Sequence, residues 1–130
     1  MESWPVPRCS MQKDDAVYVG HMLERARAVL AKTSGISRSE FENDENLRIT
    51  VAHFIQNIGE SARRVSPRFQ QSHPEIPWKK IIAMRHKVVH DYLEINFDIV
   101  WLVATVNLQP LVIELEKLVP LDKQKDSPNA

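Results

Sequence analysis

The sequence predicts an all-α protein, and three observations about apolar spacing, glycine and proline predict it. In the long segments, apolar side chains recur every three or four residues, the period of a helix with one buried face. The 130 residues include only three glycines. The eight prolines cluster at the ends and at a few boundaries, which favours long helices over a turn-rich β fold. Long helices joined by short connections pack as an antiparallel bundle, here of about four to five helices in one domain.

The first helix is expected over residues 13–33. Its apolar face consists of five residues at helical spacing: Ala16, Val19, Leu23, Ala26 and Leu30. Gly35 should end it, because glycine readily adopts the left-handed conformation that closes a helix. Residues 1–12 are proline-rich and aperiodic and are expected to form a flexible tail, with Met11 as an alternative start of the chain.

A short helical turn should follow, because Ser37 and Glu40 have the spacing of a capping box. This turn would carry Phe41 inward. Asn43 or Asp44 is expected to cap the next long helix, since both side chains accept hydrogen bonds from free helical N–H groups.

The second long helix has one clear apolar face, and its members are Val51, Ile55, Ile58, Ala62 and Val65, with Leu47 and Phe54 on its flanks. Gly59 lies inside this helix and costs about 1 kcal/mol relative to alanine. The close approach of another helix is the expected reason. Ser66–Pro67 should end the helix, because proline disfavours a helical conformation in the residue before it.

Two more helices are expected beyond a connector at residues 69–77. The third helix should start at about Trp78 and end near residues 90–92. Asn96 should cap the fourth, and Pro110 should kink it, because proline removes one backbone hydrogen bond.

The helical domain is therefore expected over residues 13–119, with a flexible tail at 120–130. A single cysteine, Cys9, excludes a disulfide within the chain and a cysteine-based zinc site. The first residues lack the pattern of a signal peptide, and no apolar run reaches the roughly 18 residues that a membrane span needs. We expect a cytoplasmic protein with no membrane association.

Basic residues are concentrated in the middle of a chain whose formal net charge is zero. Residues 63–90 contain seven basic side chains and one acidic side chain, that of Glu75. Such a local field attracts a polyanion, although a solvated basic face would have the same composition. The residues expected to bind RNA are Arg63, Arg64, Arg68 and Lys87.

The segment Met84–Tyr92 contains the chemically useful side chains. RNA has its own nucleophile, the 2′-hydroxyl, so its cleavage needs a base, an acid and a cation but no metal. Histidine titrates near neutrality and serves as base or acid, and arginine grips phosphate oxygens with two hydrogen bonds. Arg85 and His90 are the predicted catalytic pair. On an ideal helix they lie about 140° apart, so they converge only if the arginine reaches round or the helix loosens near His90.

Two other interpretations of these residues remain open. His86 and His90 are spaced like metal ligands on one helix, but the glutamate of the metalloprotease helix is absent between them; no metal and no cofactor are predicted. His90 could instead be a hydrogen-bonded core histidine, and Arg85 a salt-bridge partner of Glu60. The remaining histidines, expected to be structural or exposed, are His21, His53 and His73.

The segment from Arg85 to His90 resembles the signature of the HEPN superfamily, an arginine and a polar residue followed, after three more positions, by histidine. The run His90-Asp91-Tyr92 resembles the His-x-Tyr ending of the HepT-like toxins within it. The resemblance covers roughly residues 14–119. Flanking segments agree in the same order: Asn57–Ala62, His73–Trp78 and Phe97–Trp101.

This resemblance implies a HEPN-fold homodimer in which the arginine and histidine of both chains face a shared cleft. It implies a metal-independent endoribonuclease toxin of a type VII-like toxin–antitoxin system that cuts tRNA or mRNA. Its antitoxin would be a minimal nucleotidyltransferase that transfers AMP to Tyr92. His86 stands where asparagine is commoner, and Asp91 where a small residue is frequent; with Glu60 they are candidate supporting residues.

The alternative function is a non-catalytic HEPN module that docks a nucleotidyltransferase and binds nucleotide or RNA. A purely structural helical dimer is a third possibility. The motif alone does not separate these from a ribonuclease.

Overall fold

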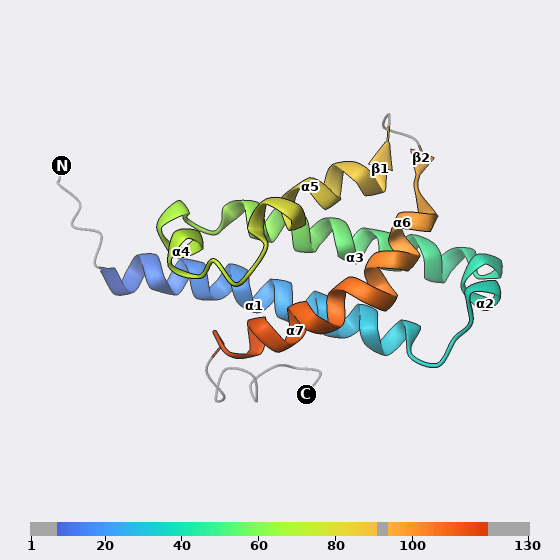
Figure 1. Cartoon of the computed structure of the whole chain (residues 1–130), viewed down its shortest axis with the longest axis horizontal. Coiled ribbons are helices and arrows are strands. Elements are labelled where there is room, and N and C mark those ends of the chain that lie inside the picture. The colour runs from blue at the N-terminus through green and yellow to red at the C-terminus, as the bar shows by residue number, and fades with distance from the viewer. Residues whose placement is uncertain (1–7, 91–93, 120–130) are drawn as a thin grey trace.

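The computed structural model describes residues 8–90 and 94–119, and for residues 8–13, 89, 90 and 94 it describes the backbone alone. Its helices run alternately in opposite directions (Figure 1). Helix α1 (Arg8–Thr33) packs along α3 (Glu45–Arg64), and α3 packs along α5 (Trp78–Val88). A last rod consists of α6 (Phe97–Leu102), the π-helical turn η1 (Val103–Asn107) and α7 (Leu108–Glu116), and it lies against α1 and α3. The predicted all-α bundle is confirmed.

The first helix begins at Arg8, inside the range expected as a tail, and ends at Thr33 as predicted. Residues 8–12 contain no glycine or proline, so nothing in this stretch opposes continuation of the helix. Thr33 closes the helix with a hydrogen bond from its hydroxyl to the Val29 carbonyl (2.8 Å). Gly35 follows with the positive φ of 76° expected of a glycine at this position.

Helix α2 (Arg38–Asn43) has the predicted capping box. The Ser37 hydroxyl accepts from the Glu40 N–H at 3.1 Å, and the Ser37 N–H donates to the Glu40 carboxylate at 2.8 Å. Phe41 is fully buried, with its ring 5.1 Å from that of Trp101.

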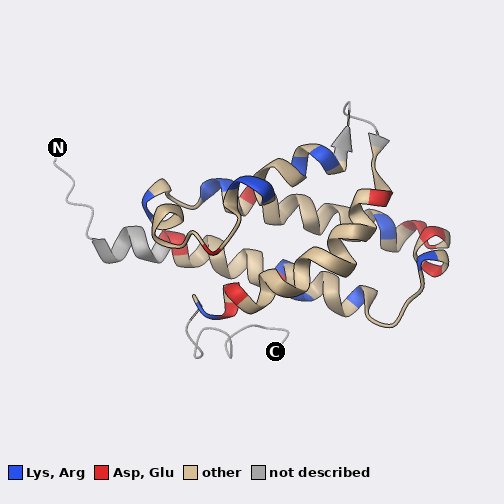
Figure 2. Ribbon diagram, viewed as in Figure 1, with Lys and Arg blue, Asp and Glu red and all other residues tan. Residues whose placement is uncertain are grey.

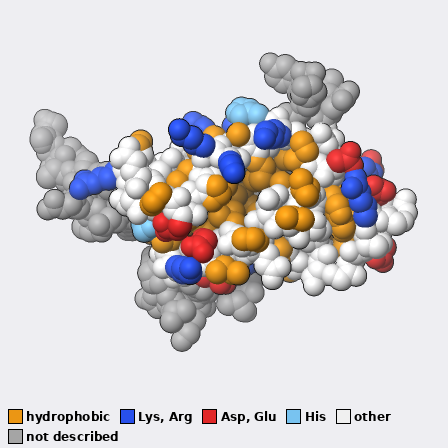
Figure 3. Space-filling view, viewed as in Figure 1, with side chains coloured by type: hydrophobic (Ala, Val, Ile, Leu, Met, Phe, Trp, Pro, Cys, Tyr) orange, Lys and Arg blue, Asp and Glu red, His pale blue; other side chains and the backbone are white. Residues whose placement is uncertain are grey.

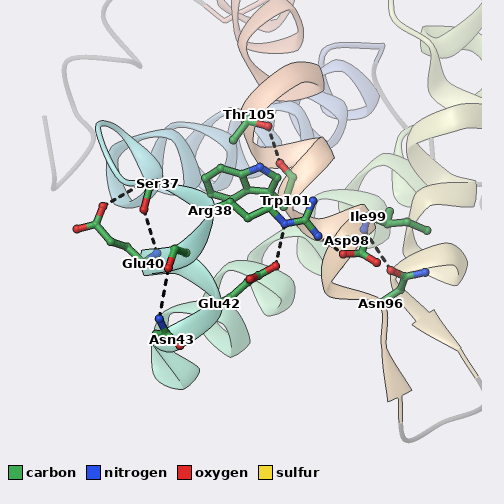
Figure 4. A network of polar contacts seen from close by, with 11 residues as sticks. Ser37, Arg38, Glu40, Glu42, Asn43, Asn96, Asp98, Ile99, Trp101 and Thr105 are labelled. Atoms are coloured by element: carbon green, nitrogen blue, oxygen red, sulfur yellow. Dashed lines mark hydrogen bonds and ion pairs between the residues drawn. The ribbon is translucent and has the colours of Figure 1, made fainter.

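Of the two candidate caps for the next helix, Asp44 is the one used, and its carboxylate accepts from the Leu47 N–H at 3.1 Å. Charged contacts also tie α2 to α6. Arg38 bridges Glu42 on its own helix (2.9 Å) and Asp98 on α6 (Figure 4).

The second long helix buries the predicted face, and Gly59 has the predicted reason. A Cβ added at Gly59 would lie 3.0 Å from the Arg85 Cβ and 3.2 Å from the Ile81 carbonyl oxygen. Helices α3 and α5 therefore come closest at Gly59, where any larger residue would push them apart.

The connector expected at residues 69–77 contains a helix, α4 (Pro67–Ser72), so that prediction was wrong in part. Helix α3 ends with Val65 as its C-cap, and the next residue, Ser66, caps α4, since its hydroxyl accepts from the Phe69 N–H at 3.2 Å. Pro67 occupies the first helical turn, where its missing N–H costs nothing. The buried Asp15 of α1 holds this cap by accepting from the Ser66 N–H (2.9 Å) and hydroxyl (2.8 Å).

Helix α5 ends at Val88, two to four residues earlier than predicted. The chain continues into a short antiparallel ribbon, β1 (Val89–His90) with β2 (Glu94–Ile95). The Asn96 N–H donates to the Val88 carbonyl at 2.8 Å and so satisfies the end of the helix. Consecutive β-branched valines favour this change from helix to extended backbone.

The last rod starts at the predicted cap, where the Asn96 side chain accepts from the Ile99 N–H at 3.2 Å. The π-helical turn η1 ends at Asn107, three residues before Pro110. In an α-helix the ring of Pro110 would crowd the carbonyl of Val106, to which it has no N–H to donate. A wider π turn accommodates this conflict.

By length and composition alone, Phe97–Glu116 is apolar enough to cross a membrane, with a mean hydropathy of 1.4. The expectation that no segment would be long and apolar enough was therefore wrong. Core helices of globular proteins have the same composition, and one side of this rod is buried in the bundle. Its buried residues are Val100, Val103, Ala104, Leu108, Leu111, Val112 and Leu115.

Replacing Gly59 by alanine should destabilise the protein by about 1 kcal/mol. The forced contacts with Arg85 and Ile81 cost about 1–3 kcal/mol, and the gain in helix propensity returns only about 1 kcal/mol. Gly20 is the matched control, because it also lies in a helix but has nothing within 4 Å of an added Cβ. Gly20→Ala should stabilise by about 0.5–1 kcal/mol. Urea denaturation measures both, and equal stabilisation by the two substitutions would contradict the close contact.

Candidate active site

Arg85 lies in the last turn of α5, with its Cβ directly over Gly59 of α3. The close contact at Gly59 sets the position from which the arginine side chain starts. About two-fifths of that side chain is exposed (42%), so part of it is in contact with solvent.

The carboxylate of Glu60, the residue after Gly59, meets three arginines. Arg63 approaches it with two nitrogens, Nε at 3.3 Å from Oε1 and Nη2 at 2.6 Å from Oε2. Arg64 donates from Nε to Oε2 at 3.1 Å. Arg85 reaches across from α5 and places Nη1 3.1 Å from Oε1. We call these four residues the Glu60 cluster, which has three positive charges around one negative charge.

The electrostatics of the cluster favour the charged forms of Glu60, Arg63 and Arg64. Hydrogen bonds from Arg63 and then Arg64, with the nearby positive charges of Arg63 and Arg85, lower the pKa of Glu60 from 4.5 to about 2. The Glu60 carboxylate in turn raises the pKa of Arg63 and of Arg64. The carboxylate is therefore ionised at any pH at which the protein would act.

The interpretation of Arg85 as a salt-bridge partner of Glu60 is thus supported by the geometry. It does not exclude a role in binding phosphate, because the ion pair uses Nη1 on a side chain that is still partly exposed. A guanidinium has five N–H donors in a planar fork, so one carboxylate contact leaves capacity for a phosphate.

His90 lies in β1, beyond the end of the helix, and the structure describes its backbone only. Asp91 and Tyr92, the proposed supporting and modified residues, lie outside the described residues. Because the chain leaves α5 at Val88, the helical angle of 140° does not apply to Arg85 and His90. The helix end near His90 was one of the two conditions under which the pair was expected to converge.

The other predicted residues lie along an exposed basic edge. His86 and Lys87 are exposed in the last turn of α5, and Arg68 is exposed on α4. Figure 2 shows that lysines and arginines mark both ends of α5 and the adjoining end of α3. Arg63 and Arg64 belong to this edge but are also engaged with Glu60, a double role that the sequence analysis did not assign.

The remaining histidines contribute no cluster. His21 and His53 are exposed, and His73 pairs with Glu75 at 3.2 Å and packs on the Phe69 ring at 4.4 Å. Among the side chains that the structure describes, no group of three or more His, Cys, Asp or Glu could hold a metal ion. Asp15, the buried carboxylate at Ser66, was missed by the sequence analysis because its partner is 51 residues away.

Comparisons with known proteins agree with one another. The family profile described as Ribonuclease HepT-like matches residues 22–118. A Caldanaerobacter subterraneus protein named "Putative RNase TTE0752" is 31% identical over 109 residues, 84% of this chain and 94% of its own length. "Probable ribonuclease HepT" of Thermococcus cleftensis is 26% identical over 108 residues, 83% of this chain and 98% of its own. No solved structure matches significantly.

Acid titration should reveal the Glu60 cluster directly. The Glu60 carboxyl carbon, followed by 13C NMR, should titrate at about pH 2 rather than near 4.5. Since the folded-state pKa is depressed, the stability that Glu60 contributes is fully present above pH 4.5 and is lost as the pH falls toward 2. Arg63→Gln should raise this pKa more than Arg85→Gln, because the Arg63 hydrogen bonds are the largest cause. Glu60→Gln assigns the signal, and a wild-type midpoint near 4.5 would mean that the cluster does not form in solution.

Proposed function

The chain belongs to the HepT-like ribonuclease family, and from this premise we propose that it is a metal-independent endoribonuclease toxin with Arg85 and His90 as its catalytic residues. The observation that carries the proposal is the partly exposed side chain of Arg85, held at the end of α5 where the helix gives way to the strand containing His90. An arginine at a helix end, followed five residues later by a histidine, offers the cation and the base that cleavage of a phosphodiester needs.

The proposed reaction uses the nucleophile of the RNA itself. His90 takes the proton of a 2′-hydroxyl, and the 2′-oxygen bonds to the adjacent phosphorus as the bond to the 5′-oxygen breaks. Arg85 stabilises the charge on the crowded phosphorane with parallel N–H donors. The leaving 5′-oxygen receives a proton, and the products are a 2′,3′-cyclic phosphate and a 5′-hydroxyl.

A second copy of the chain would supply that proton. In a two-fold homodimer, the partner's His90 would face the same cleft and act as the acid. The rod α6–η1–α7 supports this proposal, because Leu102, Val106 and Ile113 are each about half exposed. Figure 3 shows hydrophobic side chains gathered between α5 and α7, with lysines and arginines along the upper edge of the same face. Exposed apolar surface of this kind favours contact between proteins.

The basic edge would bind the RNA on either side of the reacting phosphate. Arg68 and Lys87 are exposed, as are Lys79 and Lys80 at the start of α5. Exposed cations along one edge neutralise successive phosphates without reading the base sequence. Such contacts suit a polyanion such as RNA, and tRNA or mRNA is the target class that the family resemblance implies.

We also propose the regulation that the family resemblance suggests. A partner nucleotidyltransferase, the antitoxin of a type VII-like system, would transfer AMP to the hydroxyl of Tyr92. Tyr92 is two residues after His90. The added phosphate would therefore lie close enough to compete with RNA for Arg85 and His90.

Purified protein should cleave single-stranded RNA in the presence of EDTA and leave 2′,3′-cyclic phosphate ends. Arg85→Ala and His90→Ala should each lower the rate by about 10²–10⁴-fold. Lys117→Ala is the control, because Lys117 is an exposed cation just after the end of α7, where it pairs with Glu114 (3.1 Å). Gel electrophoresis and mass spectrometry of the ends measure the outcome. Loss of cutting on chelation, or full activity of both variants, would refute the proposal. No cutting by the wild type, with harmless expression in the absence of the partner, would favour the non-catalytic module.

Tyr92→Phe should stay toxic but escape the antitoxin, because the ring remains and the hydroxyl that receives AMP is gone. Co-expression with the nucleotidyltransferase should rescue growth of cells that carry the wild type but not of cells that carry the variant. Intact mass should show an added AMP on the wild type alone. Rescue of the Tyr92→Phe strain, or AMP on another residue, would contradict Tyr92 as the regulated position.

A further inference from the structure

Two neighbouring residues of α3, Gly59 and Glu60, hold Arg85 in place, and the first acts through backbone packing. Gly59 lets α3 and α5 approach until an added Cβ would lie 3.0 Å from the Arg85 Cβ. The next residue, Glu60, then forms an ion pair with Arg85, with Oε1 of Glu60 3.1 Å from Nη1 of Arg85. One residue of α3 therefore sets where the arginine starts, and its neighbour sets where the arginine points.

Glu60 contributes more to the orientation of the Arg85 side chain than to the free energy of folding. Its side chain is 28% exposed and those of Arg63 and Arg64 are more than half exposed. Water screens such pairs, so each adds little to the free energy of folding. Three arginines on one carboxylate nevertheless leave a local excess of two positive charges, with long side chains held in one place.

The shape of the cluster matches that of a phosphate site. Arg63 grips both carboxylate oxygens with its fork, the geometry that guanidinium groups also use for phosphate. Arg64 and Arg85 approach the same two oxygens from other sides. A phosphate could receive the same donors if Glu60 gave up part of them.

We propose that Glu60 is a positioning residue: it aims Arg85 at the reacting phosphate, and in the RNA-free protein it occupies the place where Arg63, Arg64 and Arg85 would receive a phosphate of the substrate. This inference rests on the proposed ribonuclease function. It assigns Glu60 two effects of opposite sign. The carboxylate speeds the chemical step by holding Arg85, and it weakens RNA binding by opposing the phosphate charge.

Two substitutions separate these effects. Glu60→Gln removes the charge and keeps the length of the side chain, so RNA should bind about threefold to fivefold more tightly, while kcat should fall about tenfold or more as Arg85 loses its aim. Glu60→Asp keeps the charge and shortens the reach, so kcat should fall with RNA affinity unchanged. Single-turnover cleavage gives kcat, and fluorescence anisotropy of a fluorescein-labelled single-stranded RNA gives Kd in a His90→Ala background.

Glu114→Gln is the matched control. It makes the same change of charge next to a lysine, at the 3.1 Å pair with Lys117 on α7, and should alter neither kcat nor Kd. Thermal denaturation of every variant identifies loss of folded protein. A purely structural role would lower the active fraction of Glu60→Gln without tightening RNA binding.

The outcomes of these experiments distinguish failure of the positioning role from failure of the proposed ribonuclease function. Full cleavage by Arg85→Ala would overturn the proposed function. If Arg85→Ala is inactive but Glu60→Gln keeps wild-type kcat and Kd, the function stands and the positioning role is refuted. Tighter RNA binding together with slower cleavage in Glu60→Gln, with slower cleavage alone in Glu60→Asp, supports both effects.

Discussion

The contact between α3 and α5 at Gly59 is the constraint on which the rest of the site depends. With no side chain at this position, the Arg85 Cβ and the Ile81 carbonyl come as close to α3 as backbone packing allows. The approach places α5 so that its last turn ends beside Glu60. Strand β1, which contains His90, begins directly after this helix. Gly59, a residue that is unfavourable inside a helix, is therefore the one that brings Arg85 close to Glu60.

Charge is arranged around this contact in a way that net composition conceals. The chain has zero formal charge, but the segment from Arg63 to His90 is strongly basic. Part of that excess is held by Glu60, which keeps three guanidiniums together that would otherwise repel one another. The lowered pKa of Glu60 shows how strongly they favour its charged form. A single carboxylate thus keeps a basic cluster compact while leaving a surplus for a polyanion.

Local rules of sequence predicted the elements whose causes are local. The Ser37–Glu40 capping box, the Asn96 cap and the apolar face of α3 each depend on residues three or four apart, and each is present. Local rules failed at Ser66–Pro67, where the end of one helix is also the start of the next. Ser66–Pro67 was interpreted only as the end of a helix, although a serine followed by proline is equally a helix start. The π turn was missed because its cause, Pro110, acts on the preceding turn.

The site itself was predictable only in part, for a related reason. Arg63 and Arg64 lie three and four residues from Glu60, so helical spacing alone could have paired them with it. Arg85 is 25 positions further on, and the sequence offered its pairing with Glu60 only as an alternative to catalysis. The two interpretations are compatible, since a carboxylate that holds an exposed arginine determines where its free donors point. In the reaction that we propose, where Arg85 stabilises the phosphorane, the ion pair with Glu60 would be part of the catalytic arrangement and would not compete with it.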